Sequence, residues 1–357
     1  MRSRSPFRRE RRSQRPWRSP VHPGRVLLVR LHALGDVAVV LPAIGIIART
    51  WPHARIDMLT APPADSVART LPSLNNVYVY DVASTRTERA IDALTYGMVV
   101  RRMNYDVIID FQRNHVTRLI RRLSGASAWS EFDRFSPLPA AERVRQTVTA
   151  CGIPGAALDI PVRTAEVAAR GARMRLMEAG WDGSTRLAVF NPAGLWSSRN
   201  WPLENYVELY RLWSEREPLC VLILGTDRIG ARGAAIARGC GGNVINLASR
   251  TTAGEAFALL RHADVIVTED SGLMHMAWAA GVPVVALFGS TNSTWSSPPG
   301  ERSVCLNSDD LPCGSCMQPT CRFGDVRCLA RRTPAEVLGA ALGLLERVHA
   351  HTQNAGS

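Results

Sequence analysis

Two short turns that follow apolar stretches carry the residues best suited to chemistry. In the first, RVLLVRL is followed by HALGDV, where Gly35 permits a tight turn and Asp36 falls at the start of a helical stretch. The positive end of a helix keeps a carboxylate ionised, which suits a general base. Asp is also a favoured helix cap, so this motif alone explains Asp36 equally well as a capping residue.

The second turn joins DVIVTED to LMHMAWAAG through Ser271 and Gly272. Free N–H groups at such a helix start can bind a pyrophosphate, and a Ser hydroxyl can donate to it. His275 lies one turn further on the same face, and Asp270 could accept hydrogen bonds from a ribose or sugar hydroxyl. The alternative is a capped, buried helix with a core histidine. Neither turn contains G-x-G-x-x-G, which disfavours a nicotinamide dehydrogenase.

Two loops of the second half add further candidates for the same ligand. In NPAGLWSSRNWP, Arg199 could hold diphosphate oxygens with a bidentate fork, while Gly194 and Ser198 leave the backbone accessible. The alternative is that the tryptophans pack and Arg199 is a surface charge. Asp227, after LCVLILGT, is a weaker candidate for a ribose or base contact.

The segment IIDFQRNHVTR supplies candidates for a second substrate. Asp110, Gln112 and Arg113 begin the stretch after a predicted strand and are expected to face an acceptor. Arginines there suit a phosphorylated or carboxylated saccharide. For Arg118 a solvated helix face is an equally good explanation.

The elements that must position these residues alternate between short apolar strands and amphipathic helices. That alternation predicts an α/β protein with parallel sheets covered on both faces, in which ligands sit beyond the carboxyl ends of the strands. A Gly- and Pro-rich stretch without a period interrupts the alternation midway. We therefore predict a tail (1–24), a first Rossmann-like domain (25–150), a linker (151–163), a second such domain (164–330) and a last helix with its tail (331–357).

Composition agrees with two globular domains. The chain has 357 residues, of which 46% are hydrophobic and 21% charged, enough apolar surface for two cores. Its net charge is +12, and every one of the basic side chains is Arg. Such a charge suits nucleic acid, an anionic membrane or a phosphorylated substrate. The Arg-rich tail lacks interleaved aromatic residues or a recognisable module, so no specific nucleic acid is expected.

Targeting signals are not evident in the sequence. No apolar segment follows the first arginines as it would in a signal peptide, and the longest apolar run is too short to span a bilayer. We expect a cytoplasmic protein that makes peripheral contact with an anionic inner membrane.

Eight cysteines include a cluster in the segment 305–328. Cys313, Cys316, Cys321 and Cys328 have spacings that could bind zinc tetrahedrally, with free thiols as the alternative. We assign no metal and no cofactor, and the sequence offers no convincing Asp-x-Asp metal motif. The cluster follows the last predicted core strand, so we expect it to support structure away from the ligand loops.

Four motifs in one order give the sequence a recognisable pattern. They are R-L-x-x-L-G-D-V-x-x-x-L-P, Y-D-x-x-I-D-x-Q, N-P-x-G-x-W-S-S-R-x-W-P and D-S-G-x-M-H-x-A-x-A-x-G-V-P-V-V-A-L-F-G-x-T. This order resembles glycosyltransferase family 9, the lipopolysaccharide heptosyltransferases, over about residues 25–349. The resemblance implies a GT-B fold, in which two doubly wound domains face each other across a cleft. It also implies metal-independent inverting transfer from a donor that is typically ADP-heptose to a lipid-linked or phosphorylated saccharide of the lipopolysaccharide core.

The resemblance also assigns roles to individual residues. It places the catalytic carboxylate on Asp36 and the phosphate-binding cation on Arg199, where family members commonly carry Lys. The usual P-G-A is P-A-G here, which puts backbone contacts of that loop in doubt. The predicted donor-binding set is Gly35, Gly194, Ser198, Arg199, Asp227, Asp270, Ser271, Gly272 and His275. Alternatives are another nucleotide sugar, a non-lipopolysaccharide acceptor, or a non-catalytic nucleotide-sugar-binding protein, although the retained Asp36 argues against the last.

Overall fold

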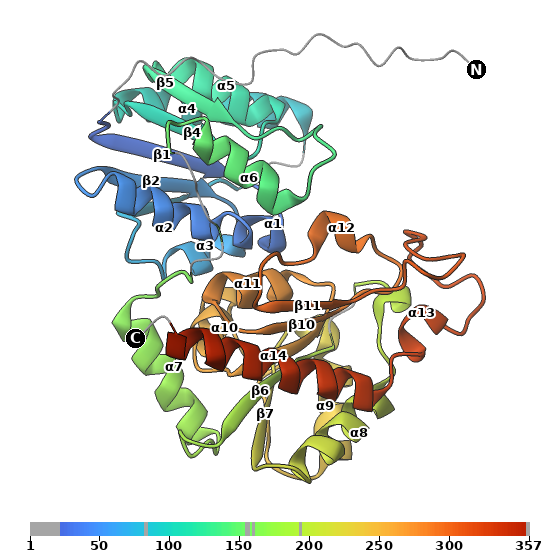
Figure 1. Cartoon of the computed structure of the whole chain (residues 1–357). Coiled ribbons are helices and arrows are strands. Elements are labelled where there is room, and N and C mark those ends of the chain that lie inside the picture. The colour runs from blue at the N-terminus through green and yellow to red at the C-terminus, as the bar shows by residue number, and fades with distance from the viewer. Residues whose placement is uncertain (1–21, 82–84, 154–157, 159–160, 193–194, 355–357) are drawn as a thin grey trace, which may run out of the picture.

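A computed structural model describes residues 22–81, 85–153, 158, 161–192 and 195–354. Two parallel sheets stand one above the other, each flanked by helices (Figure 1). The predicted tail lies almost wholly outside the described residues, and so does part of the predicted linker. The domain boundaries therefore stay a prediction.

The first sheet has five parallel strands in the order β3-β2-β1-β4-β5. Its strands are β1 (Arg25–Arg30), β2 (Arg55–Thr60), β3 (Asn76–Val79), β4 (Val107–Asp110) and β5 (Ala128–Glu131). Burial on both faces explains the continuous apolar runs of β1 and β4. The sequence did not reveal β5, because AWSE has no such run and holds its place through buried polar contacts.

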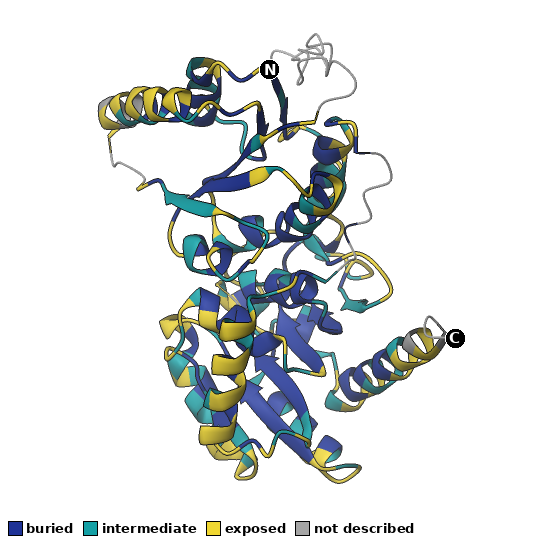
Figure 2. Cartoon of the chain, turned by 90° about the vertical axis from the view of Figure 1, so that its left-hand side faces the viewer, coloured by how far each residue is buried: buried dark blue, intermediate teal, exposed yellow. Residues whose placement is uncertain are grey.

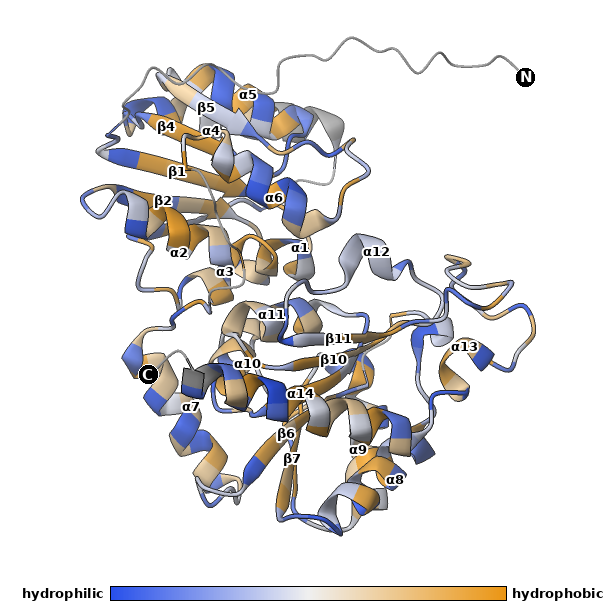
Figure 3. Ribbon diagram, viewed as in Figure 1, coloured by the Kyte–Doolittle hydropathy of each residue, from blue (hydrophilic) through white to orange (hydrophobic). Residues whose placement is uncertain are grey.

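The second sheet has six parallel strands in the order β11-β10-β9-β6-β7-β8. Its strands are β6 (Arg186–Asn191), β7 (Leu219–Ile223), β8 (Val244–Asn246), β9 (Val265–Glu269), β10 (Val284–Leu287) and β11 (Ser303–Leu306). Strand β11 was not predicted; it pairs with β10 and begins the Cys-rich segment, and Cys313, Cys316, Cys321 and Cys328 follow it. Hydrophobic residues line both sheets, as Figure 3 shows.

Helices cover both faces of each sheet. Those of the first half are α1 (Leu34–Ala38), α2 (Leu41–Thr50), α3 (Ala64–Ala68), α4 (Arg86–Arg102), α5 (His115–Ser124) and α6 (Ala140–Thr149). The helical stretch predicted to start at Asp36 is divided into α1 and α2, because Pro42 cannot donate a backbone hydrogen bond and the chain starts a new helix around it.

The second half opens with α7 (Glu166–Glu178), the short 3-10 helix η1 (Ser197–Arg199) and α8 (Leu203–Ser214). It continues with η2 (Asp227–Ile229), α9 (Gly230–Cys240), α10 (Ala253–Leu260), α11 (Gly272–Ala280), α12 (Ser293–Ser296), α13 (Arg327–Ala330) and α14 (Pro334–Asn354). Within the described part of the chain, no helix is long and apolar enough to cross a membrane.

The two halves touch through short helices. Helix α1 packs against α11, and α3 packs against α10, where the backbone N–H of Gly254 donates to Ser66 Oγ at 3.0 Å. A Cβ on Gly35 would lie 3.3 Å from Cα of Gly272. Only glycine pairs allow so close an approach, so the turns carrying Asp36 and Ser271 meet at the contact between the halves.

Candidate active site

Asp36 is the third residue of α1 and does not cap it. The capping position belongs to Ala33, and no side chain bonds the first turn. The Asp36 carboxylate instead accepts a hydrogen bond from Arg30 Nη2 at 2.8 Å and contacts Nδ1 of His32. The capping explanation of Asp36 is therefore wrong, and the i,i+4 spacing of His32 was the signal for a partner that sequence analysis missed.

The surroundings of Asp36 favour its ionised form. Burial by itself raises the pKa of this carboxyl, but the hydrogen bond with His32 and the charges of Arg30, His32 and His275 outweigh it, so the pKa lies below its ordinary value. The side chain is still 37% exposed. Asp36 is thus an ionised carboxylate that remains accessible from outside the protein.

The start of α11 carries the second predicted cluster. Ser271 caps the helix, since its Oγ accepts a hydrogen bond from the backbone N–H of Met274 at 3.3 Å. The hydroxyl donates to Oδ1 of Asn191 at 2.7 Å, and Thr268 donates to the same oxygen at 2.9 Å. Asn191 ends β6, so it orients the α11 turn from the neighbouring strand, a role that the sequence motif did not reveal.

His275 connects this turn with Asp36. A Cβ on Gly35 would lie 3.2 Å from Cδ2 of His275, so the imidazole abuts the turn before Asp36. Burial lowers the pKa of His275, and the charges of Asp270 and Asp36 oppose this. Residues predicted separately from the two halves of the chain therefore converge here.

Arg199 is held beside the same turn. Its Nη1 lies 3.2 Å from a carboxylate oxygen of Asp270, and its guanidinium stacks 3.9 Å from the ring centre of Trp196. The loop behind it is fixed by Glu269, a buried carboxylate that accepts from the backbone N–H of Trp201 at 2.7 Å and from Arg232 at 3.2 Å. Sequence analysis missed Glu269 and Arg232, which position the loop from β9 and α9.

Ser198 connects this loop to the Cys-rich segment. Its buried Oγ lies 2.8 Å from Ser290 Oγ and donates to the carbonyl of Gln318 at 2.5 Å, and its N–H donates to the carbonyl of Pro319. The expectation that the cysteine cluster lies away from the ligand loops is therefore wrong. Among the residues described, no three His, Cys, Asp or Glu side chains are arranged to hold a metal ion.

Two donor candidates remain, Asp227 and Gly194. Asp227 is exposed at the start of η2, where its carboxylate accepts a hydrogen bond from the backbone N–H of Arg228 at 3.0 Å. Gly194 lies outside the described residues.

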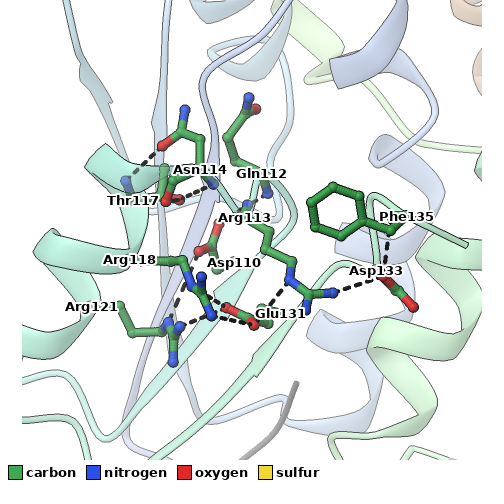
Figure 4. Close-up of polar contacts among 10 residues, drawn as sticks. All are labelled: Asp110, Gln112, Arg113, Asn114, Thr117, Arg118, Arg121, Glu131, Asp133 and Phe135. Carbon is green, nitrogen blue, oxygen red and sulfur yellow. Dashed lines mark hydrogen bonds and ion pairs between the residues drawn. The ribbon is translucent and has the colours of Figure 1, made fainter. Parts of the chain in front are cut away.

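The predicted acceptor residues form part of a dense polar network (Figure 4). Asp110 is fully buried and accepts from the backbone N–H groups of Gln112 and Arg113 at 2.9 and 3.0 Å. Arg113 itself pairs with Glu131 at 3.1 Å and with Asp133 at 2.7 Å. Asp110 therefore shapes the turn, and the charge of Arg113 is already matched within the protein.

Gln112 extends away from this network and accepts a hydrogen bond from the backbone N–H of Leu31 at 3.2 Å. Arg30 also bonds the carbonyl of Phe111, so the ends of β1 and β4 are tied together beside Asp36. Arg143 on α6 completes this region and was not among the predicted residues. Its guanidinium lies 4.9 Å from the ring centre of Phe132, which Arg30 approaches at 5.1 Å.

Comparison with known proteins identifies the family of the chain. The model of glycosyltransferase family 9 (heptosyltransferase) matches residues 139–327. Lipopolysaccharide heptosyltransferase 1 of Pseudomonas aeruginosa is 28% identical over 322 residues, which cover 84% of this chain and 88% of the relative.

Solved structures match the fold. A family 9 glycosyltransferase from Veillonella parvula superposes with a TM-score of 0.75 at 19% identity, covering 91% of this chain and 97% of the other. The ADP-heptose lipopolysaccharide heptosyltransferase II of E. coli gives a TM-score of 0.70 at 19% identity, covering 91% and 99%. The predicted GT-B arrangement of two doubly wound parallel-sheet domains is thereby confirmed. The chain belongs to glycosyltransferase family 9, the heptosyltransferases.

Proposed function

We propose that this glycosyltransferase moves a heptose-like sugar from an ADP-sugar donor to a lipopolysaccharide core or related saccharide, with inversion and without a metal ion. The observation that carries the proposal is the ionised, accessible carboxylate of Asp36 against the glycine contact that joins α1 to the start of α11.

Asp36 acts as the general base. It accepts the proton of the acceptor hydroxyl while that oxygen attacks the anomeric carbon from the face opposite the departing diphosphate, and this geometry inverts the configuration. Arg30 and His32 orient the carboxylate, and their charges keep it ionised before the acceptor arrives. A low pKa makes Asp36 a weak base, so its proton transfer accompanies bond formation and does not precede it.

The departing ADP gains negative charge that the second half of the chain receives. Arg199 offers a bidentate fork, and the first turn of α11 offers backbone N–H groups. A cation and a helix start together can take the place of a divalent ion. A diphosphate can replace Asp270 as the partner of Arg199, because a diphosphate bears more negative charge than a single carboxylate.

The residues discussed above concern the diphosphate of the donor, and the donor's sugar and nucleotide base have to be inferred from related proteins. The neighbouring E. coli structure is an ADP-heptose enzyme by name, which favours ADP-heptose as the donor here. None of the side chains discussed above selects between sugars, so a different nucleotide sugar is the alternative.

A lipid-linked acceptor fits one surface of the first half. Helix α4 leaves Ile91, Leu94, Met98 and Val99 exposed at helical spacing, and Figure 2 shows this exposed side of α4 at the upper left. Exposed Arg101 and Arg102 end the helix. An apolar stripe with terminal cations suits an anionic membrane interface, so we include peripheral contact with the inner face of the membrane in the proposal.

The test is a transfer assay with a panel of ADP-, GDP- and UDP-sugars and a lipopolysaccharide core acceptor, read by mass spectrometry. We expect a mass increase of one heptose with the ADP donor and with no added divalent ion. Transfer only with another nucleotide sugar, or donor binding without any transfer, would replace the proposal by one of the alternatives.

A further inference from the structure

Arg143 is a cation beside the proposed base with no anion of its own. Its guanidinium and that of Arg30 both lie over the ring of Phe132, at 4.9 and 5.1 Å from the ring centre. Arg30 has a partner in Asp36 at 2.8 Å. Among the residues described, no carboxylate comes within ion-pair distance of Arg143, and its buried Nε has no hydrogen-bond partner.

Two other arginines that were predicted to bind substrate differ from Arg143 because each has a carboxylate partner. Arg113 is matched by Glu131 and Asp133, and Arg199 is matched by Asp270. The charges of Asp36 and Asp133 reach Arg143 only at longer range, where they oppose the lowering of its pKa by burial. A guanidinium that is partly desolvated and unpaired is costly unless an external anion completes it.

We propose that Arg143 binds an anionic group of the acceptor saccharide, a phosphate or a carboxylate, and so turns the acceptor hydroxyl toward Asp36. This inference rests on the proposed function. A guanidinium presents a planar fork that matches both kinds of oxyanion. Phe132 holds that fork in place by a cation–π contact, which reduces the side-chain freedom lost on binding.

Arg143 and the donor groups lie on different elements. Arg143 lies on α6, which packs on β5 and α2 in the first half and also contacts α12 of the second half, whereas Arg199 lies on η1 and the proposed diphosphate site at the start of α11. The donor diphosphate already has those two groups to receive it. Loss of Arg143 should therefore weaken acceptor binding and leave ADP binding unchanged.

Arg145 provides a matched control on the same helix. It lies two residues further on and is held by Glu142 through two hydrogen bonds of 2.7 and 2.6 Å. We would compare Arg143→Gln, Arg143→Lys and Arg145→Gln with the wild type, measuring KM for the acceptor, kcat and ADP affinity by calorimetry. We expect Arg143→Gln to raise acceptor KM about ten- to hundred-fold, as for a lost charge-assisted hydrogen bond, with Lys restoring part of it. Arg145→Gln should stay within about twofold, the range of an exposed pair.

Two modified acceptors identify the anion. One has its phosphates removed enzymatically, and the other has its carboxylates converted to methyl esters. The modification that removes the partner of Arg143 should raise wild-type KM and erase the difference between wild type and Arg143→Gln. A difference that survives both modifications, an unchanged acceptor KM, or an equal loss of ADP affinity would overturn the proposal.

Two further controls keep the outcome decisive. Thermal unfolding of each variant checks the fold, and if the Gln variant does not fold, the Lys variant is compared on the same acceptors. If the wild type transfers no heptose at all, the proposed function fails. Calorimetric binding of the intact and modified acceptors to wild type and variant then still decides the role of Arg143.

Discussion

Two groups of arginines on the same domain differ in what neutralises them. Arg113, Arg118 and Arg121 converge on Glu131, a carboxylate with no exposed side-chain surface, at 3.1, 3.4 and 2.6 Å (Figure 4). Arg143, on the helix α6 that packs on β5, stacks on the ring of Phe132 and has no carboxylate within ion-pair distance among the described residues. The charges of Arg113, Arg118 and Arg121 are balanced by Glu131 within the protein, whereas the charge of Arg143 is available to a ligand.

The difference bears on the choice of acceptor residues, which stays a prediction. Arg113 follows a strand end, as a ligand-binding arginine often does, yet its guanidinium already forms ion pairs with Glu131 and Asp133. Arg143 sits in the middle of an ordinary amphipathic helix and carries no motif. The role of an arginine follows from how many anions surround it, which only the folded chain determines.

Asp36→Asn should have the largest effect. It keeps the size of the side chain but removes the base, so turnover should fall about a hundred- to ten-thousand-fold while ADP affinity changes little. Steady-state transfer and ADP calorimetry on the same folded variant provide the measurement. Near-normal turnover would remove Asp36 from the chemistry.

The same residue makes a prediction about pH. The pKa of Asp36 lies below the ordinary value of an aspartate. The ionised base therefore predominates at neutral pH and is lost only when the pH falls through this lowered pKa. We expect no change in turnover from Asp36 between about pH 6 and 8. Because burial lowers the pKa of His275 from its ordinary value of about 6.5, its protonation belongs at the acid end of this range or below it, and a fall in kcat there that is absent from His275→Gln would assign the titration to His275.

Glu131→Gln tests whether the ion pairs of Glu131 with Arg113, Arg118 and Arg121 stabilise the fold. It leaves three arginines around a neutral amide, and removing one partner of a buried ionic cluster costs about 3–5 kcal/mol in the free energy of unfolding. Chemical denaturation would measure this. The matched control is Glu142→Gln, which breaks the exposed pair with Arg145 and should cost about 1 kcal/mol or less. Equal stabilities of the two variants would show that the Glu131 group is not structural.

Much of the fold was predictable from the sequence, because continuous apolar strands can only lie in covered parallel sheets. Strands β5 and β11 were not, since AWSE is held by buried polar contacts and SVCL is a four-residue edge strand whose residues are only half-buried. In the site, motifs indicated Asp36, Ser271 and Arg199. The residues that position these groups, such as Asn191 and Glu269, act across the sheet at separations of about 70 to 80 residues, and no local pattern reveals them.

Arg199→Ala tests whether an arginine on the donor side that is paired in the free protein can also bind a ligand. If this cation exchanges Asp270 for a diphosphate, its loss should weaken ADP binding and lower kcat/KM together, each about ten- to hundred-fold. The control is Arg228→Ala, an exposed arginine of η2, which should leave both unchanged. Normal ADP affinity of Arg199→Ala by calorimetry would show that Asp270 is its permanent partner, as Glu131 is for Arg121.

The smallest expected effect concerns the exposed stripe on α4, where apolar side chains lack a partner much as Arg143 lacks an anion. Replacing Ile91, Leu94 and Met98 with Ser removes surface that could enter a membrane interface but touches no ligand loop. We expect about tenfold weaker binding to vesicles that contain anionic lipid, because partly inserted side chains contribute less than full burial, and unchanged transfer to a soluble, delipidated acceptor. The control replaces Val167, Met174 and Met177 of α7, which are as exposed but belong to the second half. If both triple variants bind vesicles as the wild type does, the stripe does not contact the membrane. A change from dimer to monomer in the α4 variant alone would assign the stripe to a second copy of the chain.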